Sequence, residues 1–249
     1  MKLHIAPSYE HLRPQLERLP ELFAAGAGET LHAGRNTIRA IEMGGQRLAA
    51  KRFKRPNAFN SLVYAYLRKS KAQRAYEHAQ RLRAIGIDSP EPIAWCEIRR
   101  NGVIADTYFV ARYTSLRPLL DAIERYPADD SRAVLESFAA FAANLHKLGV
   151  EHKDFNSTNT IYACDPATQD YRFQLIDINR MRFHPRALSP DQGIANFQRL
   201  TGRTDAFLYI LDRYAAVRGL ESFATRLQGA RCRLNFRYRR RLKYKLRRR

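Results

Sequence analysis

The sequence predicts an α+β protein with two parts, a small antiparallel sheet followed by a mainly helical region. Between Glu29 and Phe53, short runs of strand-forming residues alternate with glycine-containing turns. Further on, the segment 131–149 (SRAVLESFAAFAANLHKLG) carries apolar residues at helical spacing over one broad face. The chain has 249 residues, 45% hydrophobic and 27% charged, which is enough for one large core or two small lobes.

The first part of the chain predicts five strands and one major helix. Residues 1–30 are interpreted as an N-terminal extension, with leucines at rough helical spacing and no assigned chemistry. Residues 31–111 form the predicted N-lobe. Its first three strands are ETLHA, TIRAIEM and QRLAAKRF, and two more, around PIAWCEI and DTYFVARY, flank a turn at Asn101-Gly102.

The helix of this N-lobe follows Pro56, which closes the third strand. Asn57 or Asn60 is the expected N-cap, and the helix is predicted to run through AQRAYEHAQRLRAIG to Gly86.

The predicted C-lobe covers residues 112–228. Its long core helix leads directly to Glu151, and a hairpin follows in which TIYA and YRFQLI flank a proline-containing turn. Further helices are expected around 191–201, 204–217 and 219–228. Residues 229–249 are predicted to form a basic C-terminal tail.

The segment His152–Asn159 (HKDFNSTN), followed by Asp177 at the end of an apolar strand, has the spacing of a kinase catalytic loop and its metal-binding aspartate. In this pattern Asp154 accepts the proton of the substrate hydroxyl. A hairpin returns the chain to its starting point, so Asn159 and Asp177 are predicted to share magnesium on ATP.

Each of these residues alone is also typical of a turn or helix cap. The joint spacing, behind a core helix and around a hairpin, favours the functional reading. His152 is expected to pack and to form hydrogen bonds rather than to carry a proton, and the role of Asn156 is left open.

The third strand offers a cation for the phosphates of ATP. Ala49 and Lys51 share one face of AAKRF, so a small residue leaves room for adenine beside the ammonium group. The alternative is that Lys51 belongs to a solvated basic run. Glu77, in the following helix, is the predicted partner that orients Lys51, with an exposed helical glutamate as the alternative.

The turn Gly34-Arg35-Asn36 lies where a phosphate-covering loop is expected, although one glycine replaces the usual glycine-rich pattern. Backbone amides of Arg35 and Asn36, or the Arg35 side chain, are candidates for phosphate contact. The segment 109–112 is the predicted adenine-binding hinge.

These residues resemble the protein-kinase-like superfamily and, more closely, the lipopolysaccharide kinase (Kdo/WaaP) family. The resemblance covers roughly residues 30–200 and includes AAKRF (49–53), HKDFNSTN (152–159) and LIDINRMRF (175–183). It implies a two-lobed protein-kinase-like fold, ATP and Mg²⁺ as donor and cofactor, and a hydroxyl of Kdo or another inner-core sugar of lipopolysaccharide as acceptor.

By matching positions, the resemblance also implies that Lys51 binds phosphate, Glu77 orients Lys51 and Asp154 is the base. Asn159 and Asp177 then hold the metal. Ile178-Asn179 stands where protein kinases have Phe-Gly, and no A-P-E motif follows, which disfavours a protein substrate and control by an activation loop.

The formal net charge of +20 and the pI near 10.4 predict a polyanionic partner. Residues 231–249 hold eleven Lys or Arg interleaved with aromatic and aliphatic residues, a mixture suited to anionic lipid headgroups. RNA accepts the same composition. A second docking element is considered at 59–67, with a helix packed on the N-lobe as its alternative.

Together these features predict a cytoplasmic enzyme that associates peripherally with the inner membrane and acts on Kdo-lipid A or core lipopolysaccharide. No apolar run is long enough for a membrane span, and three widely spaced cysteines predict neither disulfides nor zinc. The alternatives are a protein or aminoglycoside-like small-molecule kinase, or a nucleic-acid-binding module. No stable protein partner can be inferred from the sequence.

Overall fold

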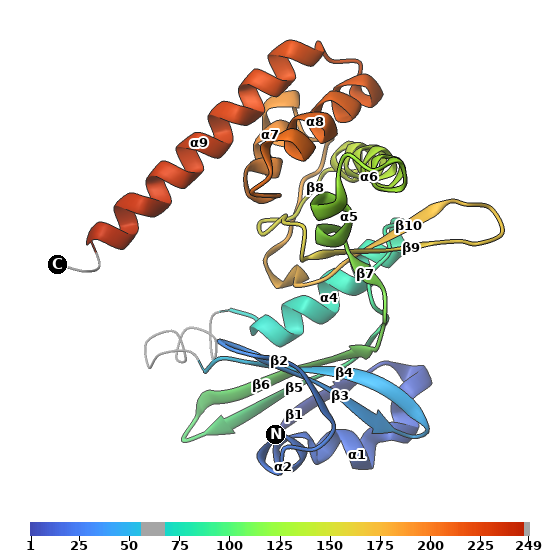
Figure 1. Cartoon of the computed structure of the whole chain (residues 1–249). Coiled ribbons are helices and arrows are strands. Elements are labelled where there is room, and N and C mark those ends of the chain that lie inside the picture. The colour runs from blue at the N-terminus through green and yellow to red at the C-terminus, as the bar shows by residue number, and fades with distance from the viewer. Residues whose placement is uncertain (56–67, 247–249) are drawn as a thin grey trace. The chain divides into compact units, whose positions relative to one another are not determined.

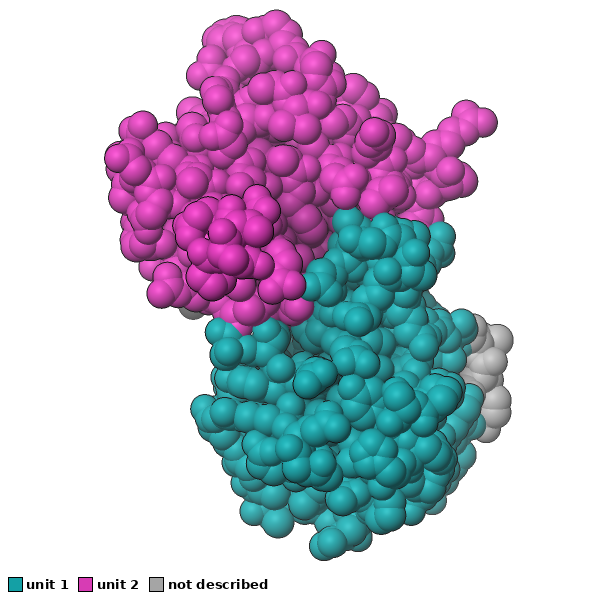
Figure 2. All heavy atoms as spheres, turned by 90° about the vertical axis from the view of Figure 1, so that its right-hand side faces the viewer, with its two compact units in different colours: residues 1–115 teal, residues 116–249 magenta. Residues whose placement is uncertain are grey.

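The computed structural model describes residues 1–55 and 68–246, and the chain divides into two compact units, Met1–Ser115 and Leu116–Arg249 (Figures 1 and 2). The first unit is built on an antiparallel sheet and the second is mainly helical. This is the α+β fold class that the sequence predicts.

The sheet of the first unit has six strands in the order β1-β5-β6-β4-β3-β2, and all neighbours are antiparallel. The strands are β1 (Lys2–Ile5), β2 (Glu29–Ala33), β3 (Thr37–Met43), β4 (Gln46–Phe53), β5 (Pro92–Arg100) and β6 (Val103–Arg112). Five strands were expected from the sequence. The sixth, β1, pairs with β5, which lies about ninety residues further along the chain.

Residues 2–24, interpreted from sequence as part of an extension, belong to the core of this unit. The short helices η1 (Pro7–Leu12), α1 (Arg13–Glu17) and α2 (Leu19–Ala24) bury Leu12, Leu16 and Leu19 against one face of the sheet. The helical spacing of these leucines therefore reflects core packing.

The other face of the sheet carries α4 (Lys71–Ala84). Ala72, Ala75 and Tyr76 of this helix pack against Phe53 and Trp95. The helix begins at Ser70, whose hydroxyl accepts a hydrogen bond from the amide of Gln73 at 3.1 Å. The predicted caps at Asn57 and Asn60, and the candidate docking element 59–67, lie outside the described residues.

The second unit contains five helices and five short strands among its described residues. The helices are α5 (Leu119–Arg125), α6 (Asp129–Lys147), α7 (Pro190–Asn196), α8 (Thr204–Arg218) and α9 (Ser222–Leu246), with 3-10 turns η2 (Ile178–Arg180) and η3 (Phe197–Arg199). The strands are β7 (Arg117–Pro118), β8 (Val150–Glu151), β9 (Thr160–Cys164), β10 (Tyr171–Leu175) and β11 (Arg182–Phe183).

The predicted core helix is α6, which packs against α8. Phe138 of α6 lies at the centre of an aromatic cluster, with ring centroids 5.6 Å from Phe155 and 5.8 Å from Phe173. The predicted hairpin is also present, because β9 and β10 pair antiparallel from Thr160–Leu175 to Cys164–Tyr171. The core thus lies directly beneath the segment 152–159.

The basic residues between 230 and 246 continue α9 without interruption (Figure 1). Arginine, leucine and lysine are good helix formers, and neither glycine nor proline follows Gly229. Gly229 lies against Leu211 of α8, and Arg233 is buried over the ring of Phe207 at 4.8 Å. The helix is therefore anchored in the second unit through its first half.

Candidate active site

The segment 152–159, here called the catalytic loop, connects β8 to β9. Asn156 shapes it, because its Oδ1 accepts hydrogen bonds from the backbone amides of Thr158 and Asn159, both at 3.0 Å. The role of Asn156 that the sequence left open is therefore structural in part. Asn156 also positions Asn159 directly before β9.

His152 fixes the start of the catalytic loop from beneath. Its Nε2 donates to the carbonyl of Ile176 at 3.0 Å, and its Nδ1 accepts from the amide of Asp154 at 3.1 Å. A ring with one donor and one acceptor role is neutral. Burial lowers the pKa of His152, although the bond to Ile176 acts in the opposite direction. These contacts fit the expected hydrogen-bonding role.

A chain of buried hydrogen bonds supports His152 from three helices. Asn196 of α7 donates through Nδ2 to the carbonyl of His152 at 2.9 Å, and its Oδ1 lies 3.2 Å from Nε2 of His146 on α6. Nδ1 of His146 lies 2.9 Å from the hydroxyl of Tyr214 on α8, which in turn accepts from Arg218 at 3.0 Å. Burial lowers the pKa of His146 to about 4.

Asp154 presents its carboxylate on top of this support. The side chain is 13% exposed, and its two oxygens bind two arginines. Oδ2 lies 2.6 Å from Nη2 of Arg180, and Oδ1 lies 2.9 Å from Nη2 of Arg199. The predicted base is thus accessible from solvent and held in a cationic environment.

Asn159 and Asp177 are brought to one end of the hairpin. The amide of Ile176 donates to the carbonyl of Asn159 at 3.0 Å, so Asp177 is the next residue after this link. Nδ2 of Asn159 donates to the carbonyl of Asp154 at 2.9 Å, which turns the amide oxygen the other way. The sequence-predicted group of three residues is therefore assembled within one unit.

Asp177 has a backbone conformation that is unfavourable for most side chains. Its φ of 54° and ψ of 40° lie in the left-handed region, which costs a non-glycine residue roughly 1–2 kcal/mol. Such strain is found mainly where surrounding structure or function requires it.

The donors of this hairpin end fit a hard cation. One carboxylate and one amide oxygen, completed by phosphate oxygens and waters, match the preference of Mg²⁺ for oxygen ligands and for few protein ligands. Within residues 1–55 and 68–246, no group of three or more His, Cys, Asp or Glu suited to a metal is present.

The first unit carries the predicted nucleotide-binding residues. Lys51 lies on β4, where it pairs with Ile38 of β3 on one side and with Phe109 of β6 on the other. Phe109 belongs to the predicted hinge segment. Ala49 and Lys51 are half-buried and alternate with the buried Ala50, which confirms that they share a strand face. Nζ of Lys51 lies 5.2 Å from the ring centre of Phe53, on the face that packs against α4.

Glu77 also lies on α4, where its carboxylate accepts from Nζ of Lys69 at 2.8 Å and from Nε2 of Gln73 at 3.0 Å. The predicted orientation of Lys51 by Glu77 stays a prediction.

The turn Gly34-Arg35-Asn36 joins β2 to β3. The Oδ1 atom of Asn36 accepts from the backbone amide of Lys54 at 3.0 Å, which holds the turn against the end of β4. The side chain of Asn36 therefore has a structural use, and the phosphate-binding role of Gly34, Arg35 and Asn36 stays a prediction.

Arg180 and Arg199 are the site residues that sequence reasoning missed. Arg180 lies three residues after Asp177, within the motif LIDINRMRF, but one arginine among many in a basic chain has no distinguishing pattern. Arg199 comes from η3, far from the catalytic loop in sequence. Only the fold brings both to Asp154.

The profile of the lipopolysaccharide kinase (Kdo/WaaP) family matches residues 41–205, which is more than half of the chain. The chain belongs to this family. Family membership makes it a phosphotransferase of the lipopolysaccharide kinase type and implies the use of ATP. A search of curated protein sequences gave no match.

Among solved structures, the chain is similar to one described as WaaP in complex with acyl carrier protein. The TM-score is 0.60 at 17% identity, over 94% of this chain and 99% of that chain. This likeness confirms the kinase-like fold for both units of the Kdo/WaaP family member.

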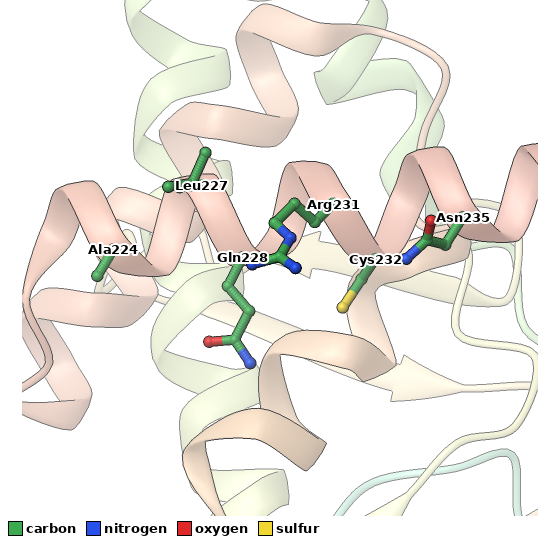
Figure 3. A pocket seen from close by; sticks show the side chains of 6 residues that line it. All are labelled: Ala224, Leu227, Gln228, Arg231, Cys232 and Asn235. Atoms are coloured by element: carbon green, nitrogen blue, oxygen red, sulfur yellow. The ribbon is translucent and has the colours of Figure 1, made fainter.

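Two further features of the described residues lie outside the predicted site. No helix in this part of the chain is both long enough and apolar enough to cross a membrane. A pocket of about 490 Å³ lies along α9 (Figure 3). It is lined by Ala224, Leu227, Gln228, Arg231, Cys232 and Asn235.

Proposed function

We propose that this Kdo/WaaP family member transfers the γ-phosphoryl group of ATP to a sugar hydroxyl of lipopolysaccharide, on Kdo or another inner-core sugar. The observation that carries the proposal is the assembly of Asp154, Asn159 and Asp177 around the catalytic loop and its hairpin. In the reaction, the acceptor oxygen bonds to the γ-phosphorus while the bond to the β-phosphate oxygen breaks. The hydroxyl proton goes to Asp154, and ADP leaves.

Asn159 and Asp177 would hold Mg²⁺ in this reaction, and the ion supplies positive charge against the phosphate oxygens. The chain's own part is to fix both ligands, through the hydrogen bond from Ile176 to Asn159 and through the contact of Asn159 with the backbone of Asp154. Movement of one ligand therefore disturbs the base as well.

The first unit supplies the nucleotide-binding residues in this proposal. Lys51 carries the cation for the phosphates, Ala49 leaves space for adenine, and Gly34-Arg35-Asn36 covers the phosphates. Glu77 orients Lys51 once Lys69 releases its carboxylate. The half-buried strand face of Ala49 and Lys51 supports this assignment.

The substitution Asp154→Asn tests the proposal. With magnesium ATP and Kdo-lipid A, we expect the wild-type protein to add one phosphate and the variant to lose roughly 10²- to 10⁴-fold in kcat, because an amide cannot take the proton. Mass spectrometry of the product measures the transfer, and thermal unfolding shows whether the variant is folded.

Normal turnover by a folded Asp154→Asn protein would contradict the role of the base. Transfer to aminoglycosides or peptides, with none to the glycolipid, would instead favour the small-molecule or protein kinase alternative on the same scaffold. Absence of any transfer, together with RNA binding, would favour the nucleic-acid-binding module.

We also propose that the second half of α9 binds the anionic membrane surface that carries the substrate, which places the enzyme at the inner membrane. The support is that basic side chains on this part of the helix are exposed beside the exposed Leu242, Tyr244 and Leu246. At about 1 kcal/mol for each basic residue near an anionic surface, four contacts suffice for reversible binding.

Co-sedimentation with phosphatidylglycerol vesicles tests this role. Deleting the tail from residue 231 would also remove the buried Arg233, so the suitable variant replaces only Arg239, Arg241, Lys243 and Lys245 by Gln. We expect this variant to lose vesicle binding, and unchanged sedimentation would contradict the membrane role. An acyl carrier protein, the partner in the WaaP structure, belongs in the same experiment as a competing ligand.

A further inference from the structure

Two arginines share the carboxylate of the proposed base. Arg180 reaches it from η2 and Arg199 from η3, at 2.6 and 2.9 Å, so each carboxylate oxygen has a guanidinium partner. Both arginines belong to the same unit as Asp154. The arrangement therefore belongs to the catalytic loop region itself.

Both arginine side chains are more exposed than the carboxylate that they contact. The Arg180 side chain is 54% exposed and that of Arg199 is 35% exposed, compared with 13% for Asp154. A molecule that reaches Asp154 therefore meets a carboxylate whose two oxygens each have a guanidinium partner. An acceptor hydroxyl must then share the carboxylate with them or displace them.

Each of the two guanidinium groups contacts Asp154 through one terminal nitrogen and has further N–H donors. A guanidinium has five N–H donors in a planar fork. In the part of the chain that the structure describes, Asp154 is the acidic partner of both arginines, through one terminal nitrogen of each. The ring of Phe236 on α9 lies 5.2 Å from the guanidinium of Arg199 and holds its plane.

The charge balance at this point differs from that of nearby basic residues. Lys153 forms an ion pair with Glu151, and Arg203 forms one with Asp205. Arg180 and Arg199 instead share the single carboxylate of Asp154, so two guanidinium groups have one acidic side chain between them. A pair of this kind suits a second anion brought by the acceptor.

We propose that Arg180 and Arg199 form the anion-binding site for the acceptor, and that they recognise a carboxylate or phosphate group next to the hydroxyl that is phosphorylated. Arginine binds both groups through paired hydrogen bonds in its plane. When the acceptor's anion binds them, the arginines turn toward it and leave an oxygen of Asp154 for the hydroxyl. The inference rests on the proposed function, and it adds the chemical feature that selects the acceptor.

The test compares three acceptors with wild-type protein, Arg180→Gln and Arg199→Gln. The acceptors are Kdo-lipid A, the same molecule with its Kdo carboxylate methylated, and the same molecule with its lipid A phosphates removed. A hydrogen bond to a charged group contributes roughly 1.5–3 kcal/mol. We therefore expect neutralising the recognised anion to lower kcat/KM of the wild-type protein by roughly 10- to 100-fold.

On the intact acceptor, each arginine variant is expected to show the same loss of kcat/KM as the wild-type protein shows on the neutralised acceptor. Each variant should then have the same kcat/KM for the intact and the neutralised acceptor, within about 2-fold. Whether methylation or dephosphorylation produces the effect identifies the anion as the Kdo carboxylate or a lipid A phosphate. Arg182→Gln is the matched control. Arg182 is exposed, and its substitution removes the same charge two residues away from Arg180.

Two results would overturn the proposal. One is a wild-type enzyme that uses all three acceptors equally. The other is a pair of variants that lose the same factor on every acceptor, which would mean that the arginines only hold Asp154 in place. Calorimetry of the three acceptors without ATP measures anion recognition independently of turnover. A kinase that acts on another acceptor would show no turnover in this assay, so failure of the proposed function is seen in turnover and failure of this inference is seen in binding.

Discussion

The catalytic loop and the turn Gly34-Arg35-Asn36 are both predicted to contact ATP phosphates or their metal, but the fold supports them very differently. The catalytic loop stands on buried hydrogen bonds from α6, α7 and α8. Among the described residues, the side chain of Asn36 ties the turn to β4 by an exposed bond, which it accepts from the amide of Lys54. The difference indicates that the fold supports the catalytic loop through several helices and the turn, whose phosphate contact stays a prediction, mainly through its neighbouring strands.

The hydrogen bonds beneath the catalytic loop restrict which residues its supporting positions can hold. The neutral ring of His152 accepts from the amide of Asp154, so a proton on Nδ1 would oppose that N–H group. Asn196 holds His152 through its carbonyl, and His146 holds Asn196. Removal of any one of these side chains leaves a buried polar atom of its neighbour without a hydrogen-bond partner. The side chains of the network are therefore strongly coupled in their effect on stability.

The largest effect is expected from filling the space beside this network. A Cβ atom at Gly193 of α7 would lie 2.3 Å from the Tyr214 hydroxyl and 3.1 Å from Nδ1 of His146. Gly193→Ala should lower the free energy of unfolding by about 3 kcal/mol, from overpacking and a lost buried hydrogen bond. Urea denaturation measures the change.

The direction of this effect is diagnostic. At an ordinary exposed helix position, the same substitution stabilises by about 1 kcal/mol. Gly202→Ala is the control for an added methyl group in open space, since Gly202 lies in the bend before α8 and no atom lies within 4 Å of its added Cβ; its free energy of unfolding should stay within about 0.5 kcal/mol of the wild type. A Gly193→Ala protein as stable as the wild type would show that the network tolerates displacement and is not the rigid support inferred above.

A second effect should appear at acidic pH. The pKa of His146 falls from 6.5 to about 4 on folding, chiefly because of burial. The unfolded chain therefore binds a proton that the folded chain does not between pH 6.5 and pH 4. Stability is lost as the pH falls through this window and levels off below it, by about 3 kcal/mol in total. The lowered pKa of His152 acts in the same direction.

His146→Gln isolates this contribution, because glutamine does not titrate. The wild-type protein should be the more stable of the two at pH 7.5, and its advantage in free energy of unfolding should shrink toward pH 4 by the same about 3 kcal/mol. Parallel pH profiles for both proteins would show that His146 keeps its ordinary pKa in the folded chain.

The local parts of the fold could be predicted from the sequence. The strands 37–43 and 46–53 have the predicted bounds, because Gly44 and Gly45 adopt the positive φ that their turn requires. The hairpin between Asn159 and Asp177 also formed as expected. In each case the deciding interactions lie within a few residues along the chain.

The parts that depend on distant residues could not be predicted. The strand β1 has only four residues and is defined by its pairing with β5. Arg199 and Asn196 reach the catalytic loop from more than forty residues away, without a spacing rule that marks them. The contiguous motif therefore marked the catalytic loop as a candidate, whereas the arginine pair and the buried hydrogen bonds beneath the loop were missed.

The smallest effect is expected at the turn. Asn36→Ala removes the acceptor of the Lys54 amide, which can bind water instead because the site is exposed, so the loss of stability should be about 1 kcal/mol or less. If the turn covers phosphate, the apparent KM of Asn36→Ala for ATP should rise by a few-fold. Arg35→Ala keeps the bond between Lys54 and Asn36, so it tests the contribution of the Arg35 side chain separately. Initial rates at varied ATP measure both. An Asn36→Ala protein that loses as much stability as Gly193→Ala would mean that the turn is as firmly supported as the catalytic loop, and the contrast between the two regions would then be wrong.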